Sequence, residues 1–145
     1  MIRALVMHGV NLDTLGRRPA EHYGTMTLTE LEARIAAWGA ELGVETSFFQ
    51  TNHEGTFCEA LHAAPARADG LVLNPGAWTH YSWAIHDALE VARLPVVEVH
   101  LSAIDDREAF RQVSVLDGLC VASVRGKGAD GYREALKVLR AEVVA

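Results

Sequence analysis

Two small groups of side chains in this sequence have the types and spacing that proton transfer requires. Tyr23 follows the adjacent arginines Arg17 and Arg18, and a guanidinium beside a phenol favours the phenolate, which can act as a base. Glu98 and His100 are two residues apart, so on a strand both side chains lie on one face. A carboxylate in that position can orient the imidazole and favour its protonated form, a general acid. The sequence therefore offers a candidate base and a candidate acid.

Each candidate also has a simpler interpretation. Tyr23 can be a surface tyrosine on a mobile loop, and His100 can be a strand-end histidine that bonds to nearby backbone. Arg111, which we expect to hold a substrate carboxylate, can be a solvated arginine, and Asn74 can simply begin a turn. Glu98 favours the functional interpretation, because an unpaired carboxylate in a buried strand is energetically costly.

Five segments rich in apolar or β-branched residues predict strands, and helical periodicity follows between them. The predicted strands cover residues 2–7, 44–50, 70–73, 95–99 and 119–124, the predicted helices cover about 28–42, 54–64, 81–92 and 132–143, and a short irregular or helical piece is expected around 105–111. Apolar strands that alternate with helices are typical of a parallel sheet covered on both faces. We therefore expect an α/β fold, a flavodoxin-like doubly wound five-stranded parallel sheet of order 2-1-3-4-5, in a single domain spanning residues 1–145.

Local signals predict where two of the helices begin. Thr27 with Glu30, and Thr51 with Glu54, each have the spacing of a capping box, in which the hydroxyl and the carboxylate satisfy backbone amides reciprocally. Gly43 is expected to end the first of these helices.

The segment from Gly9 to Gly24 follows neither the helical nor the strand period. A long loop in a compact domain is usually a lid or a binding loop. We expect this one to carry Asn11, Arg18 and Tyr23 over a pocket at the end of the first strand.

Polar residues follow those strands that the predicted order makes neighbours. Asn11 follows the first strand, Asn74 and His80 follow the third, and His100 and Ser102 come at the end of the fourth. In a doubly wound sheet, ligands bind beyond the carboxyl ends of such strands. Three loops that are distant in sequence should therefore converge on one crevice.

Composition excludes several classes of function. The 145-residue chain has a net charge of −6 and a pI of about 5.6, which argues against nucleic acid or an anionic membrane as partner. Cys58 and Cys120, in segments predicted to be core, fit a reduced compartment better than a disulfide scaffold. Without an apolar run long enough for a membrane span or a signal-peptide pattern, a cytoplasmic protein is expected. Glycine-rich phosphate loops and metal-site spacings are also lacking, which argues against nucleotide binding and against a metal site.

Many short motifs of the chain occur in a recognisable order. They are Gly9-Val10-Asn11-Leu12, Leu15-Gly16-Arg17-Arg18, Tyr23-Gly24, Gln50-Thr51-Asn52-His53-Glu54-Gly55, Asn74-Pro75-Gly76, Thr79-His80, Glu98-Val99-His100-Leu101-Ser102, Arg107-Glu108, Phe110-Arg111 and Gly128-Ala129-Asp130-Gly131-Tyr132. In this order they resemble type II 3-dehydroquinate dehydratase, over essentially the whole chain.

The resemblance implies a hydro-lyase of the shikimate pathway. The reaction would be the anti elimination of water from 3-dehydroquinate, through an enolate, to 3-dehydroshikimate. Tyr23, assisted by Arg18, would remove the proton alpha to the ketone. Asn11 would stabilise the enolate oxygen through a water, and His100, oriented by Glu98, would protonate the departing hydroxyl.

The resemblance also implies how the substrate is held and how the chain assembles. Substrate hydroxyls and carboxylate would be bound by Asn74, His80, Leu101, Ser102 and Arg111. Asp87 matches a position that, in the family, reaches the site of a neighbouring subunit. A homo-oligomer of trimers that assemble into a dodecamer is implied, and neither a cofactor nor a metal is needed.

The chain departs from the family pattern outside the proposed acid, base and enolate donor. The departures include His8, Val10, Asp13, Ala103 and Asp105. Two alternatives therefore stay open. One is a divergent relative that binds a cyclic polyol acid without turning it over, and the other is a dehydratase of a related cyclohexane carboxylate.

Overall fold

The computed structural model describes residues 1–145, with the side chain of Asp105 excepted. Its strands are β1 (Ile2–His8), β2 (Val44–Gln50), β3 (Gly70–Asn74), β4 (Val96–His100) and β5 (Ala122–Arg125). They form one sheet of order β2-β1-β3-β4-β5 in which every neighbouring pair is parallel. The predicted flavodoxin-like order is confirmed.

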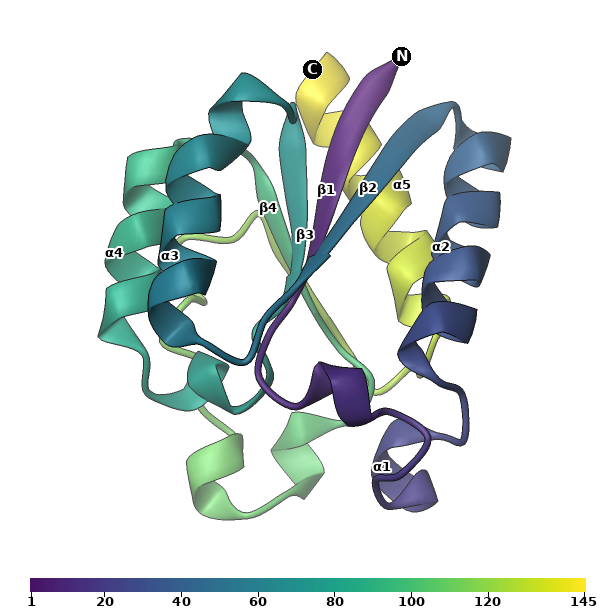
Figure 1. Cartoon of the computed structure of the whole chain (residues 1–145), viewed down its shortest axis with the longest axis vertical. Coiled ribbons are helices and arrows are strands. Elements are labelled where there is room, and N and C mark those ends of the chain that lie inside the picture. The colour runs from purple at the N-terminus through teal and green to yellow at the C-terminus, as the bar shows by residue number, and fades with distance from the viewer.

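Two pairs of helices cover the two faces of this sheet (Figure 1). The helices are α1 (Ala20–Tyr23), α2 (Leu28–Leu42), α3 (Glu54–Ala63), α4 (Trp83–Ala92) and α5 (Asp130–Val144). Alternate residues of β1 enter different cores: Ala4 and Val6 pack towards α2 and α5, and Leu5 and Met7 pack towards α3 and α4. Because successive strand side chains point to opposite faces, an entirely apolar strand requires helices on both sides.

The first helix start is as predicted and the second is not. Thr27 and Glu30 form the expected capping box, and Gly43 ends α2 in the left-handed region at φ 73°. His53 precedes α3 without any side-chain cap, because the Thr51 hydroxyl instead accepts the His53 amide at 3.1 Å. Glu54 accepts a hydrogen bond from the Ser82 hydroxyl of the neighbouring helix at 2.5 Å. A tertiary contact thus replaces the predicted capping box.

Other boundaries differ where side chains outweigh the local pattern. α4 begins at Trp83 because the Ser82 hydroxyl accepts the Ile85 amide at 3.0 Å. β5 begins at Ala122, later than predicted, because the preceding residues form turns that bury Leu116 against α3 and α4. Cys58 and Cys120, predicted to be core, are only partly buried. Among the described residues, no helix has both the length and the apolar run needed to cross a bilayer.

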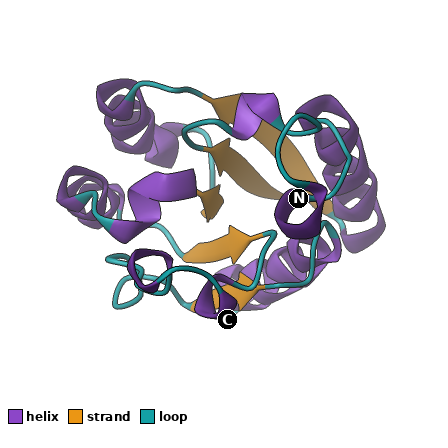
Figure 2. Cartoon of the chain, turned by 90° about the horizontal axis from the view of Figure 1, so that it is seen from below, coloured by secondary structure: helices purple, strands orange, loops and turns teal.

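The loops that follow β1, β3 and β4 gather at the end of the sheet opposite both termini (Figure 1). They contain α1 and short 3-10 helices at Leu12–Thr14, Gly76–His80, Ile104–Asp106 and Ala109–Arg111. Figure 2 views the molecule from this end. The first two loops touch where Gly9 meets Pro75: a Cβ on Gly9 would lie 2.1 Å from the Pro75 carbonyl oxygen. Only glycine allows the two backbones to approach so closely.

Candidate active site

A crevice opens among these three loops. It is lined by Leu12, Arg18, Tyr23, Asn74, Gly76, Ala77, His80, His100, Leu101, Ser102, Ile104, Arg107 and Arg111. Eight of the eleven residues proposed from the sequence are among them: Arg18, Tyr23, Asn74, His80, His100, Leu101, Ser102 and Arg111. A ninth, Glu98, lies directly behind His100.

The expected base lies on one side of the crevice, called here the base side, as a tyrosine between two guanidinium groups. Arg18 Nη2 donates to the Tyr23 hydroxyl at 2.9 Å, and the Arg18 guanidinium carbon lies 3.8 Å from the centre of the Tyr23 ring. Arg107 Nη1 approaches the same hydroxyl at 3.3 Å and the Ser102 hydroxyl at 3.3 Å. Two guanidinium groups from different loops thus contact one phenol oxygen.

The expected acid, His100, and its partner Glu98 lie on the other side of the crevice, called here the acid side, which is buried. Glu98 is fully buried in β4, and its Oε2 lies 2.5 Å from Nε2 of His100. The hydroxyls of Thr79 and Ser114 also bind this carboxylate. Because an ionised carboxylate only accepts hydrogen bonds, the His100 Nε2 must carry a proton. Nδ1 is the ring nitrogen that remains for a substrate.

The pKa of Glu98 results from two opposed effects. Burial raises it, but hydrogen bonds from His100, Thr79 and Ser114, together with the imidazole charge, outweigh burial and hold the pKa below its usual value. Glu98 is therefore ionised at neutral pH, as a group that orients an imidazole must be.

His80 lies beside His100, with the two rings stacked at 6.5 Å. Its Nδ1 is 2.7 Å from the Val113 carbonyl oxygen, so Nδ1 carries a proton and Nε2 is free to accept. Burial lowers the pKa of His80, and the charges of His100 and Arg111 lower it further against the opposing hydrogen bond to Val113. A neutral His80 is thus suited to accept a hydrogen bond from a hydroxyl group.

Two of the predicted binding residues, Asn74 and Arg111, make structural contacts in addition to lining the crevice. The Asn74 side-chain oxygen accepts the Gly76 amide at 3.1 Å, which is the turn expected of it, although the residue also lines the crevice. Arg111 Nε is paired with Glu108 at 2.7 Å. Since a guanidinium has five donors, the terminal nitrogens of Arg111 can still bind a carboxylate.

Asn11 lies next to the crevice without lining it. It adopts a left-handed conformation (φ 67°), and its backbone N–H donates to Asn52 Oδ1 at 2.8 Å. The next residue, Leu12, and then Leu15 are buried in the core beside α2. Asn52 also binds Asp13 through its side-chain nitrogen at 3.1 Å, so the loop after β2 fixes the first part of the loop after β1.

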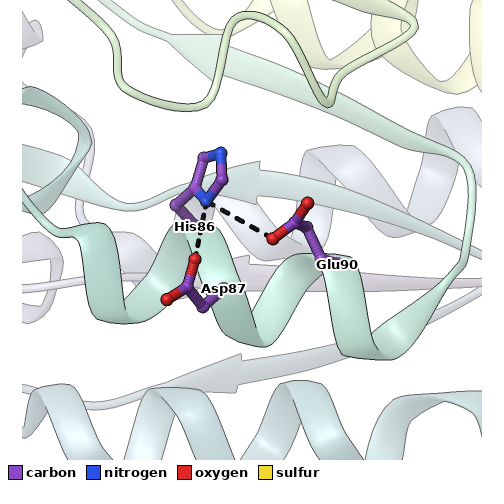
Figure 3. A group of neighbouring side chains, drawn as sticks. All are labelled: His86, Asp87 and Glu90. Carbon is purple, nitrogen blue, oxygen red and sulfur yellow. Dashed lines mark hydrogen bonds and ion pairs between the residues drawn. The ribbon is translucent and has the colours of Figure 1, made fainter.

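Asp87 lies on the exposed face of α4, outside the crevice, in a small group of possible metal ligands (Figure 3). His86 Nδ1 lies 3.0 Å from Asp87 Oδ1 and 3.7 Å from Glu90 Oε1. Contacts between adjacent residues, or residues four apart, are ordinary on a helix surface. The cluster is explained as a surface ion pair, and no metal site is inferred from it.

Three residues around the crevice were not selected from the sequence. Arg107 had a signal in the Arg107-Glu108 motif, but nothing in the motif indicated that its side chain reaches Tyr23. Thr79 had a signal in the Thr79-His80 motif and Ser114 had none, but a hydroxyl reveals a role only when its partner is known. They come to Glu98 from two different loops.

Comparisons with known proteins agree with this geometry. The family model described as Dehydroquinase class II matches residues 2–140. The 3-dehydroquinate dehydratase of Syntrophotalea carbinolica is 51% identical over 133 residues, which cover 91% of this chain and 90% of the relative. The crystal structure of the type II dehydroquinase from Butyrivibrio crossotus superposes with a TM-score of 0.92 at 38% identity, covering 96% of this chain and 97% of that one. The corresponding enzyme structure from Propionibacterium acnes gives 0.91 at 40% identity, covering 97% of each chain.

The family match spans nearly the whole chain, the solved structures share its fold, and the relative has a concordant name. The chain therefore belongs to the class II dehydroquinase family.

Proposed function

We propose that this protein is a 3-dehydroquinate dehydratase, a hydro-lyase that converts 3-dehydroquinate to 3-dehydroshikimate in the shikimate pathway, with residues 1–145 acting as one catalytic domain. One observation carries the proposal: a tyrosine hydroxyl contacted by two guanidinium groups shares a crevice with a carboxylate-bound imidazole. This is the arrangement that a base and an acid need to act on two sides of one small substrate. The names of the relatives support the same reaction.

The reaction begins with the phenolate of Tyr23. It removes the proton alpha to the ketone, and the guanidinium groups of Arg18 and Arg107 stabilise the phenolate before the transfer. The electrons left behind form the enolate. Asn11, beside the crevice, stabilises the enolate oxygen through a bridging water.

The elimination ends on the acid side. The imidazolium of His100 donates its Nδ1 proton to the departing hydroxyl, and water leaves as the enolate collapses to the enone. Glu98 compensates the imidazolium charge before the transfer and keeps Nε2 protonated afterwards. The enzyme is left with a neutral Tyr23 and a neutral His100, so solvent must return one proton from the phenol to the imidazole before the next turnover.

The substrate is held by groups around these residues. Arg111, Ser102 and the Leu101 amide bind the carboxylate, in keeping with the terminal nitrogens that Arg111 has beyond its Glu108 pair. His80 and Asn74 bind hydroxyl groups. All of these groups are side chains or amides of the chain itself, so the reaction needs no metal or cofactor.

The active assembly is an oligomer in the cytoplasm, with trimers that associate into a dodecamer. In this assembly Asp87 reaches the site of a neighbouring copy. The Asp87 side chain is 76% exposed on α4, and the exposed aromatic residues Tyr81 and Trp83 lie just before it in the chain. An exposed apolar patch of this kind supports a contact between copies.

The test is direct. Purified protein is given 3-dehydroquinate, and the ultraviolet absorbance of the conjugated enone is followed. We expect the absorbance to rise, to be unaffected by borohydride, and to disappear in Tyr23→Phe. Binding measured by calorimetry with no change in absorbance would identify a non-catalytic relative. Turnover only of related cyclohexane carboxylates would identify a different substrate.

A further inference from the structure

We propose that Thr79 and Ser114 are positioning residues for the acid side: their hydroxyls hold the Glu98 carboxylate in the one orientation that aims His100 at the substrate. This inference rests on the proposed function for what His100 does, and on the structure for how Glu98 is held.

The three side chains form a closed group in the interior. Thr79 and Glu98 are fully buried and Ser114 is 7% exposed. The Thr79 hydroxyl donates to Glu98 Oε2, and the Ser114 hydroxyl lies 2.8 Å from Oε1 and 3.0 Å from Oε2. A buried carboxylate is costly unless its lone pairs are satisfied. These hydroxyls supply hydrogen bonds that the imidazole alone cannot.

With Glu98 ionised, counting protons fixes the direction of the bonds to its carboxylate and leaves the 3.3 Å contact between the Thr79 and Ser114 hydroxyls without a proton. Each hydroxyl has one proton, and both are directed at Glu98. Ser114 Oγ in turn accepts the Leu116 amide at 3.1 Å, which orients its lone pair. A protonated Glu98 would bring a further proton into a group in which each neighbour already donates. The ionised form is therefore the one that satisfies all partners, and it requires the Nε2–H tautomer of His100.

Backbone contacts fix the two hydroxyls relative to each other. The Val115 amide donates to the Thr79 carbonyl at 2.8 Å, and His80 Nδ1 binds the Val113 carbonyl at 2.7 Å. The segment 113–116 is thus tied to the loop after β3 at Thr79 and at the next residue, His80. The same contacts that position Glu98 also position His80, so the acid and a substrate-binding residue share one support.

Other titratable groups around Glu98 do not replace these hydroxyls. The neighbouring strand residues are Leu73 of β3 and Ser123 of β5. His80, beside the loop after β3, has a lowered pKa and is neutral. Cys120, before β5, has a pKa raised to about 12, first by burial and then by the charge of Glu98, so its thiol is neutral as well. Beyond Cys120, Arg125 binds Asp117 at 2.8 Å.

The experiment compares the variants Thr79→Val and Ser114→Ala with the conservative variant Thr79→Ser and a matched control. The control is Ser123→Ala, because Ser123 pairs with Glu98 in the strand register but its hydroxyl binds Arg125. Hydrogen bonds to a buried charge are strong, so we expect kcat to fall about tenfold to a hundredfold in the first two variants. KM should change little, Thr79→Ser should keep most of the activity, and Ser123→Ala should match the wild type.

The pH profile gives a readout that a general loss of stability would not produce. Loss of a donor raises the pKa of Glu98 towards its ordinary value, so the acid limb of the kcat profile should move to higher pH. Each variant is also combined with Glu98→Gln. If the hydroxyls act through Glu98, the double variant should be about as active as Glu98→Gln alone. If the kcat losses of the two single variants instead multiply in the double variant, the proposal is overturned.

A measurement without substrate separates this proposal from the proposed function. The Glu98 carboxyl is titrated by carbon NMR in ligand-free protein, with Glu98→Gln to assign its signal. We expect folded Thr79→Val and Ser114→Ala to titrate at higher pH than the wild type. An unchanged titration in these folded variants overturns the positioning role, whereas a wild type without turnover overturns only the dehydratase function.

Discussion

The two sides of the crevice are built in opposite ways. On the acid side, Glu98 and His100 come from a central strand and are almost completely buried. On the base side, Tyr23 and Arg18 belong to the loop after β1 and are partly exposed, and Tyr23 borders a second hollow behind it. A rigid site can hold an imidazole in one tautomer, whereas a base on a loop can move aside for the substrate. Under the proposed mechanism, the acid would depend on fixed orientation and the base on mobility.

The largest expected effect comes from removing the base. Tyr23→Phe should lower kcat by about 10³-fold to 10⁴-fold, which is the upper part of the roughly 10²-fold to 10⁴-fold that general base catalysis contributes. The melting temperature should stay near that of the wild type, because the hydroxyl is partly exposed. The rise in enone absorbance measures turnover, and calorimetry measures the binding of 3-dehydroquinate. Tyr81→Phe, at a tyrosine that is 60% exposed, is the control. More than a tenth of wild-type activity in Tyr23→Phe would contradict the assigned base.

On the acid side, we expect activity and stability to fall together. Glu98→Gln should lower kcat about 100-fold, because an amide no longer specifies the Nε2–H tautomer. It should also cost about 3 kcal/mol of folding free energy by breaking a buried charged network, which corresponds to roughly 10 °C in Tm. Thermal unfolding measures the loss of stability, and the absorbance assay measures the loss of activity. A variant with lost activity and unchanged Tm would show that the acid side does not differ from the base side.

The stability difference between wild type and Glu98→Gln should depend on pH in a defined direction. The folded pKa of Glu98 is lowered, so its contribution is fully present above the unfolded pKa of about 4.3. It is lost as the pH falls through the folded pKa. Tm measured from neutral pH into the acid range should therefore show the two proteins converge. A difference that widens in acid would mean that the shift has the opposite sign.

Removal of one guanidinium should have a smaller effect than removal of the phenol. Arg18→Gln and Arg107→Gln should each lower kcat about tenfold to a hundredfold, because the other arginine still contacts the Tyr23 hydroxyl. Arg17→Gln, at the exposed neighbour of Arg18, serves as the comparison. Equal losses in Arg17→Gln and Arg18→Gln would argue against a specific contact.

The smallest effect concerns the mobility of the loop. Trypsin should cut the native protein first between Arg17 and Arg18, since the following Arg18-Pro19 bond resists this protease. Adding 3-dehydroquinate to Tyr23→Phe, which binds without turnover, should slow this cleavage by a few-fold as the loop closes. The rate at Arg93, an exposed residue after α4, provides an internal reference. Equal protection at both places would indicate global stabilisation in place of loop closure.

The sequence predicted what depends on local pattern. Apolar strands between amphipathic helices predict a parallel sheet, and the spacing of Glu98 and His100 places both on one face of a strand. The partners of a polar side chain are not local. Thr51 binds the His53 amide instead of capping α3, and Arg107 crosses to Tyr23 from a loop 84 residues away. Such contacts are decided by packing, which neither periodicity nor spacing expresses.

The buried leucines of the loop after β1 determine which parts of this loop can move. Leu12 and Leu15 are anchored in the core, and Asn11 is held by Asn52, so a closing movement begins only beyond Leu15. In the proposed mechanism, Tyr23 then lies on a short movable flap, while the backbone at Asn11 stays in place. Because the backbone at Asn11 does not move with the flap, the proposed bridging water would span the distance that remains between the Asn11 side chain and the enolate oxygen.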